Sequence, residues 1–343
     1  MKQLSVAIVG ATGAVGAEFL RLLSERDFPL ASLKLLASAR SAGKTIMFKG
    51  ESLPVEELTA DSFRGVDVAF FSAGGAQSKA FAHHAVEAGA VVIDNSSAFR
   101  MTEGVPLVVP EVNPEDALAH RGIIANPNCS TIILLMALAP LHRLSPVRRV
   151  VVSTYQAASG AGAAAMDELT EQSRAFLAGE PVTKAVFPHQ IAFNLFSHNT
   201  PIDASGYNEE ELKMVKETRK ILHAPDLLIS ATCVRVPILR AHSESVNIEF
   251  AGKRPTVDAA RAAIAAFPGV QLADDRETNT FPMPLVASGQ DDCFVGRIRE
   301  DLSHPNALDL FVAGDQILKG AALNGYQIAE LLLPTLTGNK TAS

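Results

Sequence analysis

The sequence of 343 residues has no tryptophan, only three cysteines and no long apolar run. The cysteines are odd in number and no Cys-x-x-Cys pair occurs, so neither a disulfide framework nor a structural zinc site is indicated. The longest apolar run, residues 132–141, is about half the length that spans a bilayer. The net charge is −7, whereas nucleic-acid binding needs a concentrated basic face. We therefore expect no metal, no membrane and no nucleic acid among its partners.

The N-terminus superficially resembles a secretory signal peptide, because Lys2 precedes an apolar stretch that extends to Ala17. Evenly spaced glycines within this stretch favour a strand followed by a phosphate-binding loop instead. Together with the few cysteines, this predicts a reduced, cytoplasmic protein.

The length suggests about two domains. In the first part, short apolar segments alternate with helical patterns, which is typical of a parallel sheet with helices on its faces. There we predict strands at 4–9, 33–37, 66–72, 91–94 and 123–125, and helices at 14–25 and 78–88.

From about residue 130 the predicted strands are longer and more alternating, which indicates a second domain around a mixed or antiparallel sheet. We predict strands at 147–155, 229–238, 245–250 and 294–299, and helices at 130–141, 209–222, 257–266 and 315–333. Pro334 is expected to stop the last helix, and the polar tail 335–343 to fray.

A glycine-rich loop with the spacing G-x-x-G-x-x-G joins the first predicted strand to the first predicted helix. Its glycines allow a tight turn and close approach of a pyrophosphate, and the helix N-terminus adds free N–H groups. This predicts an N-terminal Rossmann-like dinucleotide-binding domain; the alternative is a glycine turn that binds nothing. The candidate cofactor residues in the loop are Gly10, Thr12, Gly13, Ala14, Val15 and Gly16.

The end of the second predicted strand distinguishes NADP from NAD. An acid there would hold the ribose 2′-hydroxyl of NAD, but the sequence has Ser38, Arg40 and Ser41 and no acid. Arginine and serine favour a 2′-phosphate, so we predict NADP. The alternative is a solvated loop arginine.

Cys129 lies between a predicted strand and an apolar helix, and so at the first turn of that helix. There the helix dipole and unpaired N–H groups stabilise a thiolate, and the same groups can bind an oxyanion. The alternative, a buried inert thiol, is assigned to Cys233 and Cys293, which lie within strand patterns. A nicotinamide domain with a nucleophilic thiol indicates addition to a carbonyl followed by hydride exchange.

Five segments resemble the aspartate-semialdehyde dehydrogenase family over nearly the whole chain. They are GATGAVG at 10–16, SSAFR at 96–100, NPNCST at 126–131, QAASGAG at 156–162 and RVPILRAHSE at 235–244. NPNCST together with RAHSE is highly specific, since related acetylglutamyl-phosphate reductases typically have Asn-Pro-Gly-Cys around the thiol. The resemblance implies NADPH-dependent reductive dephosphorylation of β-aspartyl phosphate to aspartate β-semialdehyde, with release of phosphate, on the route to lysine, methionine and threonine.

The resemblance also implies roles for individual residues. Cys129 would be the nucleophile that carries a thioester, His242 the acid/base with an ordinary pKa near ~6.5, and Gln156 the group that orients the substrate. Substrate contacts are implied at Arg235 for the carboxylate, Glu210 for the ammonium, and Arg100, Asn128 and Lys213 for the phosphate. Further cofactor contacts are implied at Ser159, Gly160 and Gln316.

A cofactor contact at Gln316 would bring the last helix back to the nucleotide domain. We therefore predict a discontinuous NADP-binding domain of residues 1–130 with 315–343, and an α+β catalytic and dimerisation domain with a mixed sheet at 131–314. The resemblance implies a homodimer or a tetramer, and the residues do not distinguish these.

Two spacings bear on whether these residues share a site. Arg235 and His242 are seven apart and would point to opposite faces of a regular strand, so we predict an irregularity near Pro237. Glu210 and Lys213 share a face of a predicted helix that starts with a capping box at Asn208. By sequence alone this pair would be a surface ion pair.

Two alternative functions remain. One is a sibling acyl-phosphate reductase, such as N-acetyl-γ-glutamyl-phosphate reductase, which the set of Glu210, Lys213 and Arg235 disfavours. The other is a catalytically silent NADP-binding regulator, which an unreactive Cys129 would favour.

Overall fold

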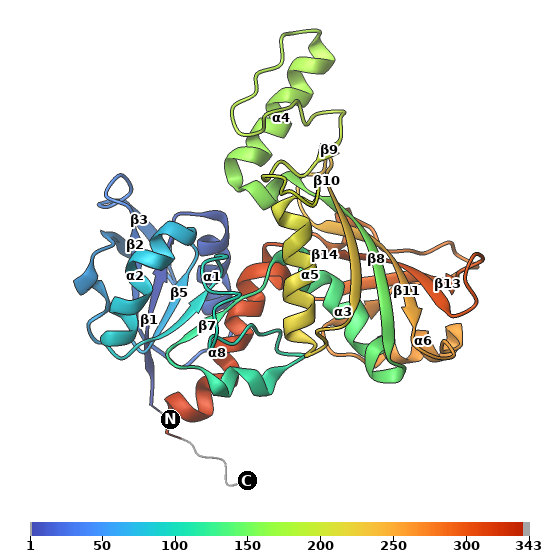
Figure 1. Ribbon diagram of the computed structural model, residues 1–343. Helices are drawn as coiled ribbons and strands as arrows, with labels where there is room; N and C mark the ends of the chain where they lie inside the picture. Colours follow the sequence, from blue (N-terminus) through green and yellow to red (C-terminus); the bar gives the residue numbers. More distant parts are fainter. Residues whose placement is uncertain (1, 339–343) are drawn as a thin grey trace. The chain divides into compact units, whose positions relative to one another are not determined.

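The computed structural model describes residues 2–338, which form two compact units (Figure 1). One unit is Met1–Asn128 with Ala321–Ser343, and the other is Cys129–Gly320. We call them unit 1 and unit 2. They divide after residues 128 and 320, whereas the sequence places the divisions at 130 and 315. Each unit contains a seven-stranded sheet, and the predicted α/β class with two different domains is confirmed.

Unit 1 alternates strands and helices along the chain. Its elements are β1 (Leu4–Val9), α1 (Ala14–Glu25), β2 (Leu30–Ala37), β3 (Thr45–Phe48), β4 (Glu51–Glu57), η1 (Ala60–Phe63), β5 (Val68–Phe71), α2 (Gly75–Glu87), β6 (Val91–Asp94), η2 (Pro114–Ala119), β7 (Ile123–Ala125) and α8 (Leu323–Leu336).

The strand order of this sheet is β3-β4-β2-β1-β5-β6-β7, and every pairing except β3 with β4 is parallel. Without β3, this is the order of a dinucleotide-binding fold, with the topological switch between β1 and β5. Ligands of such sheets bind beyond the carboxyl ends of the strands at this switch point.

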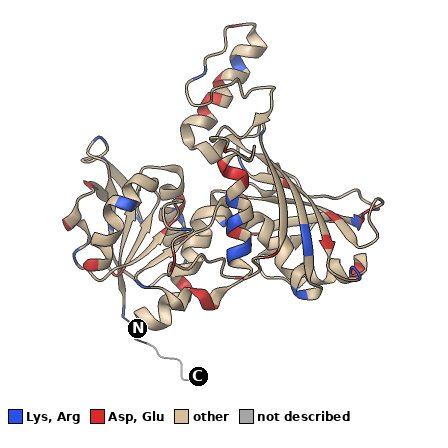
Figure 2. Cartoon of the chain, in the orientation of Figure 1, with Lys and Arg blue, Asp and Glu red and all other residues tan. Residues whose placement is uncertain are grey.

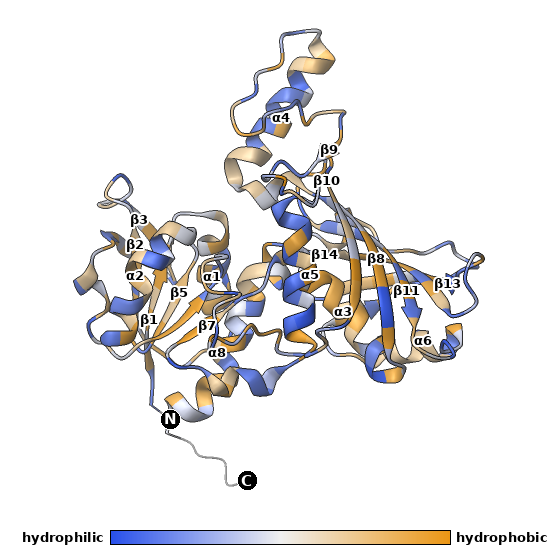
Figure 3. Ribbon diagram, viewed as in Figure 1, coloured by the Kyte–Doolittle hydropathy of each residue, from blue (hydrophilic) through white to orange (hydrophobic). Residues whose placement is uncertain are grey.

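Helices cover both faces of the sheet. Since consecutive strand residues point to opposite sides, neighbours on one strand contact helices on different faces. Phe70 of β5 stacks on Phe19 of α1 with ring centroids 4.4 Å apart. Its neighbour Phe71 instead lies in a buried cluster with Ala82 of α2. Burial on both faces explains why β1 and β5 are apolar throughout and appear mostly orange in Figure 3.

Unit 2 contains longer strands. Its elements are α3 (Cys129–Leu144), β8 (Val147–Gln156), η3 (Ala158–Ala161), α4 (Ala163–Ala178), β9 (Phe196–Ser197), α5 (Glu209–Ile221), β10 (Leu228–Arg235), β11 (His242–Phe250), α6 (Val257–Ala265), β12 (Val270–Leu272), α7 (Pro284–Ala287), β13 (Cys293–Glu300) and β14 (Ala307–Gly314).

The second sheet has the order β12-β13-β14-β11-β8-β10-β9 and is mixed, as predicted. β8 pairs with β10 in parallel and with β11 antiparallel. Helix α3 packs against α5, α6 and the central strands, and its residues 130–141 are all buried. It is therefore apolar all round rather than amphipathic.

Helix α5 carries its charges in order, with acids in the first turn and bases in the last (Figure 2). This order complements the helix dipole. The predicted capping box is confirmed: the Asn208 side chain accepts from the Glu211 N–H, and the Glu211 carboxylate accepts from the Asn208 N–H.

Four predictions about elements were wrong. The strand predicted at 229–238 ends at Arg235, and the strand predicted from 245 begins at His242. The last helix begins not at 315 but as a π-helical turn, Leu318–Ala322, that continues into α8. Pro334 lies inside α8 and does not stop it, because a proline in the last turn removes only one hydrogen bond. Of the tail that was expected to fray, residues 335 and 336 are helical, and residues 339–343 lie outside the described residues.

Several elements were not predicted, namely β3, β4, β9, β12, β14, α4 and α7. Most of these are too short to give a periodic pattern. Helix α4 was missed for another reason: it projects from the second sheet (Figure 1), so much of it lacks the regular apolar stripe of a buried helix. No helix within residues 2–338 combines the length and the apolar character needed to cross a membrane.

Candidate active site

Cys129 is the first residue of α3, as the sequence predicts. Cys129 is a partly exposed residue, whereas Cys233 and Cys293 are fully buried. Gly320 lies directly against it: a Cβ at Gly320 would be 2.9 Å from the Cys129 Cβ. A larger residue at 320 would therefore displace the start of α3.

Arg235 and His242 flank the carboxyl end of β8. Arg235 is the last residue of β10 and pairs with Gln156, while His242 is the first residue of β11. Between them the chain leaves the sheet, passes the end of β8 and returns on its other side, with Ala241 at φ 70°. The predicted irregularity is confirmed, and it removes the objection raised by the odd spacing.

His242 is fully buried, and its Nδ1 accepts a hydrogen bond from the Ala157 N–H at 3.0 Å. A neutral imidazole so held carries its proton on Nε2. Within residues 2–338, Nε2 has no hydrogen-bond partner. Burial, followed by the charge of Arg235, lowers the pKa of His242 to about 3. In the folded protein the pKa of His242 therefore lies well below the ordinary histidine value of ~6.5, because the ring is buried.

Gly160 lies beside these two side chains. A Cβ at this position would be 2.9 Å from Nη1 of Arg235 and 3.3 Å from Nε2 of His242. Its absence leaves room for both groups, which explains a glycine here in physical terms.

Arg235 is 5% exposed, and within the described part of the chain its hydrogen-bond partners are neutral groups. Nη1 donates to the Ala157 carbonyl at 3.3 Å, Nη2 to Nε2 of His198 at 2.7 Å, and the guanidinium carbon is 5.8 Å from the Phe187 ring centroid. Among the described residues no carboxylate forms an ion pair with Arg235, and its buried Nε has no partner. Burial lowers its pKa, and the charges of Glu210 and Cys129 oppose this.

Glu210 is 5% exposed at the start of α5, so it is not part of a surface ion pair. Its carboxylate accepts from the Gln156 side chain at 3.1 Å and lies 3.5 Å from Nζ of Lys213. Lys213 also contacts Glu209 at 3.0 Å. One buried carboxylate, one amide and one ammonium thus lie together beside the guanidinium of Arg235.

Gln316 connects the thiol to this group. Its Oε1 accepts from the Ala241 N–H at 2.9 Å, its Nε2 donates to Ser159 Oγ, and its Cβ lies near Gly320, which contacts Cys129. Unit 2 therefore brings together nine of the predicted site residues, namely Cys129, Gln156, Ser159, Gly160, Glu210, Lys213, Arg235, His242 and Gln316.

The remaining predicted residues belong to unit 1. There a cavity of about 490 Å³ lies at the topological switch point. Gly10 has φ 89°, and a Cβ on it would be 2.9 Å from the Ser72 carbonyl, so only glycine fits. The predicted residues that line this cavity are Gly10, Thr12, Gly13, Ser38, Arg40 and Ser41. Ala14, Val15 and Gly16 form the first turn of α1 beside it.

Arg40 is exposed at this cavity, and its guanidinium forms no ion pair with any described residue. The acid Glu57 also lines the cavity. An unpaired guanidinium at the end of β2 is chemically suited to a phosphate.

Arg100 and Asn128 are buried in unit 1. Arg100 donates from Nε to the Asn126 carbonyl at 2.9 Å and from Nη2 to the Asn95 carbonyl at 2.8 Å. The Asn126 side chain is itself held by Asn324 of α8 at 2.6 Å. These bonds fix the loop that leads to Cys129.

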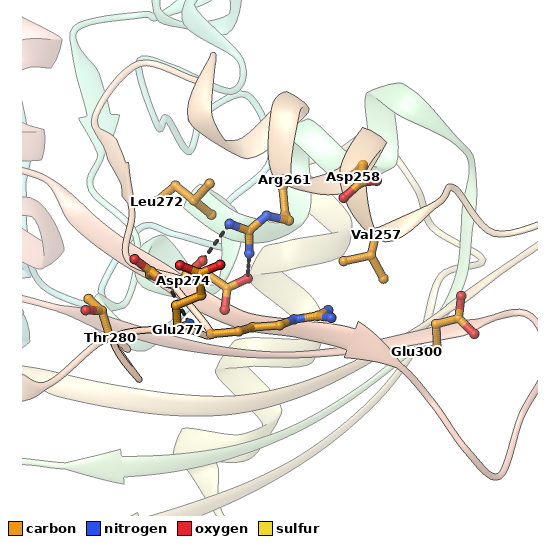
Figure 4. A pocket seen from close by; sticks show the side chains of 10 residues that line it. Val257, Asp258, Arg261, Leu272, Asp274, Glu277, Thr280 and Glu300 are labelled. Carbon is orange, nitrogen blue, oxygen red and sulfur yellow. Dashed lines mark hydrogen bonds and ion pairs between the residues drawn. The ribbon is translucent and has the colours of Figure 1, made fainter.

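A larger cavity of about 950 Å³ lies elsewhere in unit 2 (Figure 4). Arg261 is bonded to Asp274, which also accepts from the Arg297 N–H at 2.9 Å. The central charges of this cavity are thus already paired, and no cysteine or histidine lines it. Within the described residues, no group of three or more His, Cys, Asp or Glu side chains is arranged to hold a metal ion.

Two groups at the site were missed by sequence reasoning. His198 contacts Arg235, and the Ala157 N–H holds His242. A backbone donor leaves no trace in residue type. His198 lies in a segment without a periodic pattern, so only its chemical type gave a signal.

Comparison with known proteins agrees with this geometry. Residues 5–120 match a family model described as semialdehyde dehydrogenase, NAD binding domain, and residues 138–319 one described as semialdehyde dehydrogenase, dimerisation domain. The aspartate-semialdehyde dehydrogenase of Synechocystis is 61% identical over 330 residues, which are 96% of this chain and 97% of the relative. The chain belongs to the aspartate-semialdehyde dehydrogenase family.

Other aspartate-semialdehyde dehydrogenases extend this result. The Bacillus subtilis protein is 50% identical, with 96% of this chain and 97% of the relative covered. A crystal structure of aspartate-semialdehyde dehydrogenase II from Vibrio cholerae, complexed with ASA, has a TM-score of 0.94 at 44% identity, covering 97% and 99% of the two chains. The Candida albicans enzyme with NADP has a TM-score of 0.76 at 25% identity, covering 96% and 98%.

Proposed function

We propose that this protein is an NADP-dependent aspartate-semialdehyde dehydrogenase that reductively dephosphorylates β-aspartyl phosphate. The observation that carries this proposal is the environment of Arg235. A buried guanidinium, which among residues 2–338 is hydrogen-bonded by neutral groups alone, lies near a buried carboxylate, Glu210, and interacts electrostatically with the Cys129 thiol. Separate opposite charges next to a nucleophile suit an α-amino acid with a reactive acyl group.

Substrate binding uses these charges directly. Arg235 binds the α-carboxylate, because a guanidinium matches two carboxylate oxygens, and Glu210 binds the ammonium. Gln156 orients the substrate and donates to Glu210. Lys213, and from unit 1 Arg100 and Asn128, are assigned to the phosphate by the family resemblance.

The acyl step takes place at Cys129. The thiolate attacks the acyl carbon, a C–S bond forms, the C–O bond to phosphate breaks, and phosphate leaves with the electron pair. The first turn of α3 supports the thiolate and the developing oxyanion through its N–H groups. NADPH, when bound, would supply the hydride that takes the Cys129 thioester to the aldehyde level.

His242 acts as a hydrogen-bond donor in the reduction. With Nδ1 occupied by the Ala157 N–H, its proton is on Nε2, from which it would stabilise the oxyanion that precedes release of the aldehyde. Collapse of that species returns the electron pair to sulfur and regenerates the Cys129 thiolate.

The cofactor fits unit 1. The cavity at the switch point is bounded by the glycine loop, whose first glycine leaves space that a Cβ would fill, and by the unpaired Arg40. Arg40, Ser38 and Ser41 would hold the 2′-phosphate, and the loop the pyrophosphate. By resemblance, Ser159, Gly160 and Gln316 serve the nicotinamide end.

We infer a homodimer that works in the cytoplasm. Helices α3, α5 and α6 form one layer on the second sheet, while aromatic residues such as Tyr155 remain exposed. Such exposed apolar surface in a unit that matches a dimerisation domain supports association through that unit. A free nucleophilic thiol is preserved in a reducing compartment.

The test is NADP reduction with aspartate semialdehyde, measured with and without phosphate. We expect turnover that requires phosphate, and little turnover with N-acetylglutamate semialdehyde. Cys129→Ser should abolish turnover and retain NADP binding. Turnover with the acetylated substrate would favour the sibling reductase, and NADP binding without turnover of either would favour a silent regulator.

A further inference from the structure

His198 holds the substrate-facing guanidinium of Arg235, although no motif includes it. The imidazole is 7% exposed and follows β9, whose Phe196 pairs with Arg235 itself. The His198 N–H donates to the Cys233 carbonyl at 2.8 Å, so its backbone is fixed to β10. Its Nε2 lies 2.7 Å from Nη2 of Arg235.

The direction of each hydrogen bond follows from the donor inventory. A guanidinium has only donors, so Nε2 of His198 must accept, and the proton of the neutral ring is then on Nδ1. Nδ1 lies 3.3 Å from Thr200 Oγ1, which is thus an acceptor. The same oxygen accepts from the Glu210 N–H at 3.2 Å. Arg235 is thereby connected through His198 and Thr200 to the backbone of Glu210.

A neutral acceptor has a consequence that a carboxylate would not have. A carboxylate at this position would form an ion pair with Arg235, neutralise it and occupy the donors that a substrate needs. Histidine fixes the guanidinium and leaves its charge intact. Burial, together with the charge of Arg235, lowers the pKa of His198 to about 4, so the ring is neutral at pH 7.

We propose that His198 is a positioning residue for substrate recognition, which through Thr200 sets Arg235 relative to Glu210 and so selects an α-amino carboxylate. This inference rests on the proposed function. Arg235 and Glu210 can recognise the two charges of a substrate at a fixed separation only if their own positions are fixed relative to each other. The hydrogen bonds through His198 and Thr200 fix them in this way.

The test compares His198→Phe with His198→Gln, whose amide oxygen can accept from Arg235 as Nε2 does. For His198→Phe we expect the KM for aspartate semialdehyde to rise about tenfold or more, since a hydrogen bond to a charged group is lost. kcat should stay within about threefold, and the KM for NADP should not change. His198→Gln should restore most of the loss in KM.

A second readout is selectivity. Succinate semialdehyde lacks the ammonium and 3-aminopropanal lacks the carboxylate, so the preference for aspartate semialdehyde over both should shrink in His198→Phe. The matched control is His189→Phe, because His189 is exposed and its ring contacts Phe196 instead of Arg235. It should behave as the wild type.

Equal loss in His198→Phe and His198→Gln, or a fall in kcat at unchanged KM, would overturn the proposal. If His198→Phe does not fold, Thr200→Val decides, since it removes the Oγ1 acceptor and should raise the same KM. Wild-type protein without phosphate-dependent turnover would refute the proposed function itself. Normal wild-type turnover with an unaltered His198→Phe would refute only the role of His198.

Discussion

The backbone N–H of Ala157 donates to Nδ1 of His242 at 3.0 Å, and this bond fixes the tautomer of a fully buried imidazole. A ring that accepts on Nδ1 offers a proton on Nε2 and has no free lone pair there. In the proposed reaction His242 is therefore a donor, and the Cys129 thiol would lose its proton to another acceptor.

Replacement of His242 distinguishes two possible roles of its ring, hydrogen-bond donor and proton-accepting base. Asparagine can accept from Ala157 but does not reach the position of Nε2, whereas the glutamine amide N–H can approach it. We expect His242→Asn to lower kcat by about 10²-fold or more, as for loss of an oxyanion donor, and His242→Gln to lower it less. Single-turnover kinetics would show this. Equal, complete loss in both variants would indicate that the ring must accept a proton.

Burial of neutral His242 also predicts how stability depends on pH. Its folded pKa is about 3 and its ordinary value 6.5, so the unfolded chain binds more protons between these values. The stability it contributes is present above pH 6.5 and is lost as the pH falls towards 3, by about 1 kcal/mol per pH unit.

Urea denaturation at pH 7, 6 and 5 would measure this slope. The slope should be smaller in His242→Asn than in the wild type, because asparagine does not titrate. Burial raises the pKa of Glu244 well above its ordinary value and acts in the opposite sense, so only the difference between variants isolates the histidine. An identical slope would mean that folding does not lower the pKa of His242.

Removal of Arg40 should change cofactor choice. Arg40→Ala is expected to raise the KM for NADP about tenfold or more, with that for NAD unchanged, because only NADP carries the 2′-phosphate. The matched control is Arg64→Ala, since Arg64 is exposed and paired with Asp61 outside the cavity. A parallel rise for both cofactors would instead mean that Arg40 supports the loop.

Addition of one methyl group at Gly160 should damage catalysis more than folding. A Cβ there would lie 2.9 Å from Nη1 of Arg235 and 3.2 Å from Cε1 of His242, so both side chains must shift. We expect Gly160→Ala to lower kcat/KM by about 10²-fold. In Gly252→Ala nothing lies within 4 Å of the new atom, and activity should be unchanged. Similar thermal stability of the two variants would complete the comparison.

The sequence by itself determined the local features of this protein. The glycine loop predicted the turn after β1, the position of Cys129 predicted the start of α3, and Asn208 with Glu211 predicted the start of α5. These succeed because each depends on a few neighbouring residues. The seven-residue spacing of Arg235 and His242 even predicted the break between β10 and β11.

The tertiary structure alone decided which groups meet and in what state. The contact of His198 with Arg235 joins residues 37 apart in the sequence, and the bond from Ala157 to His242 joins residues 85 apart. Glu210 is buried by the same packing. Sheet order and loop packing determine such contacts, and residue type does not encode them. Burial in turn sets protonation, because desolvation of a charge depends on everything packed around it. That is why an ordinary histidine in the sequence is a neutral donor in the folded protein.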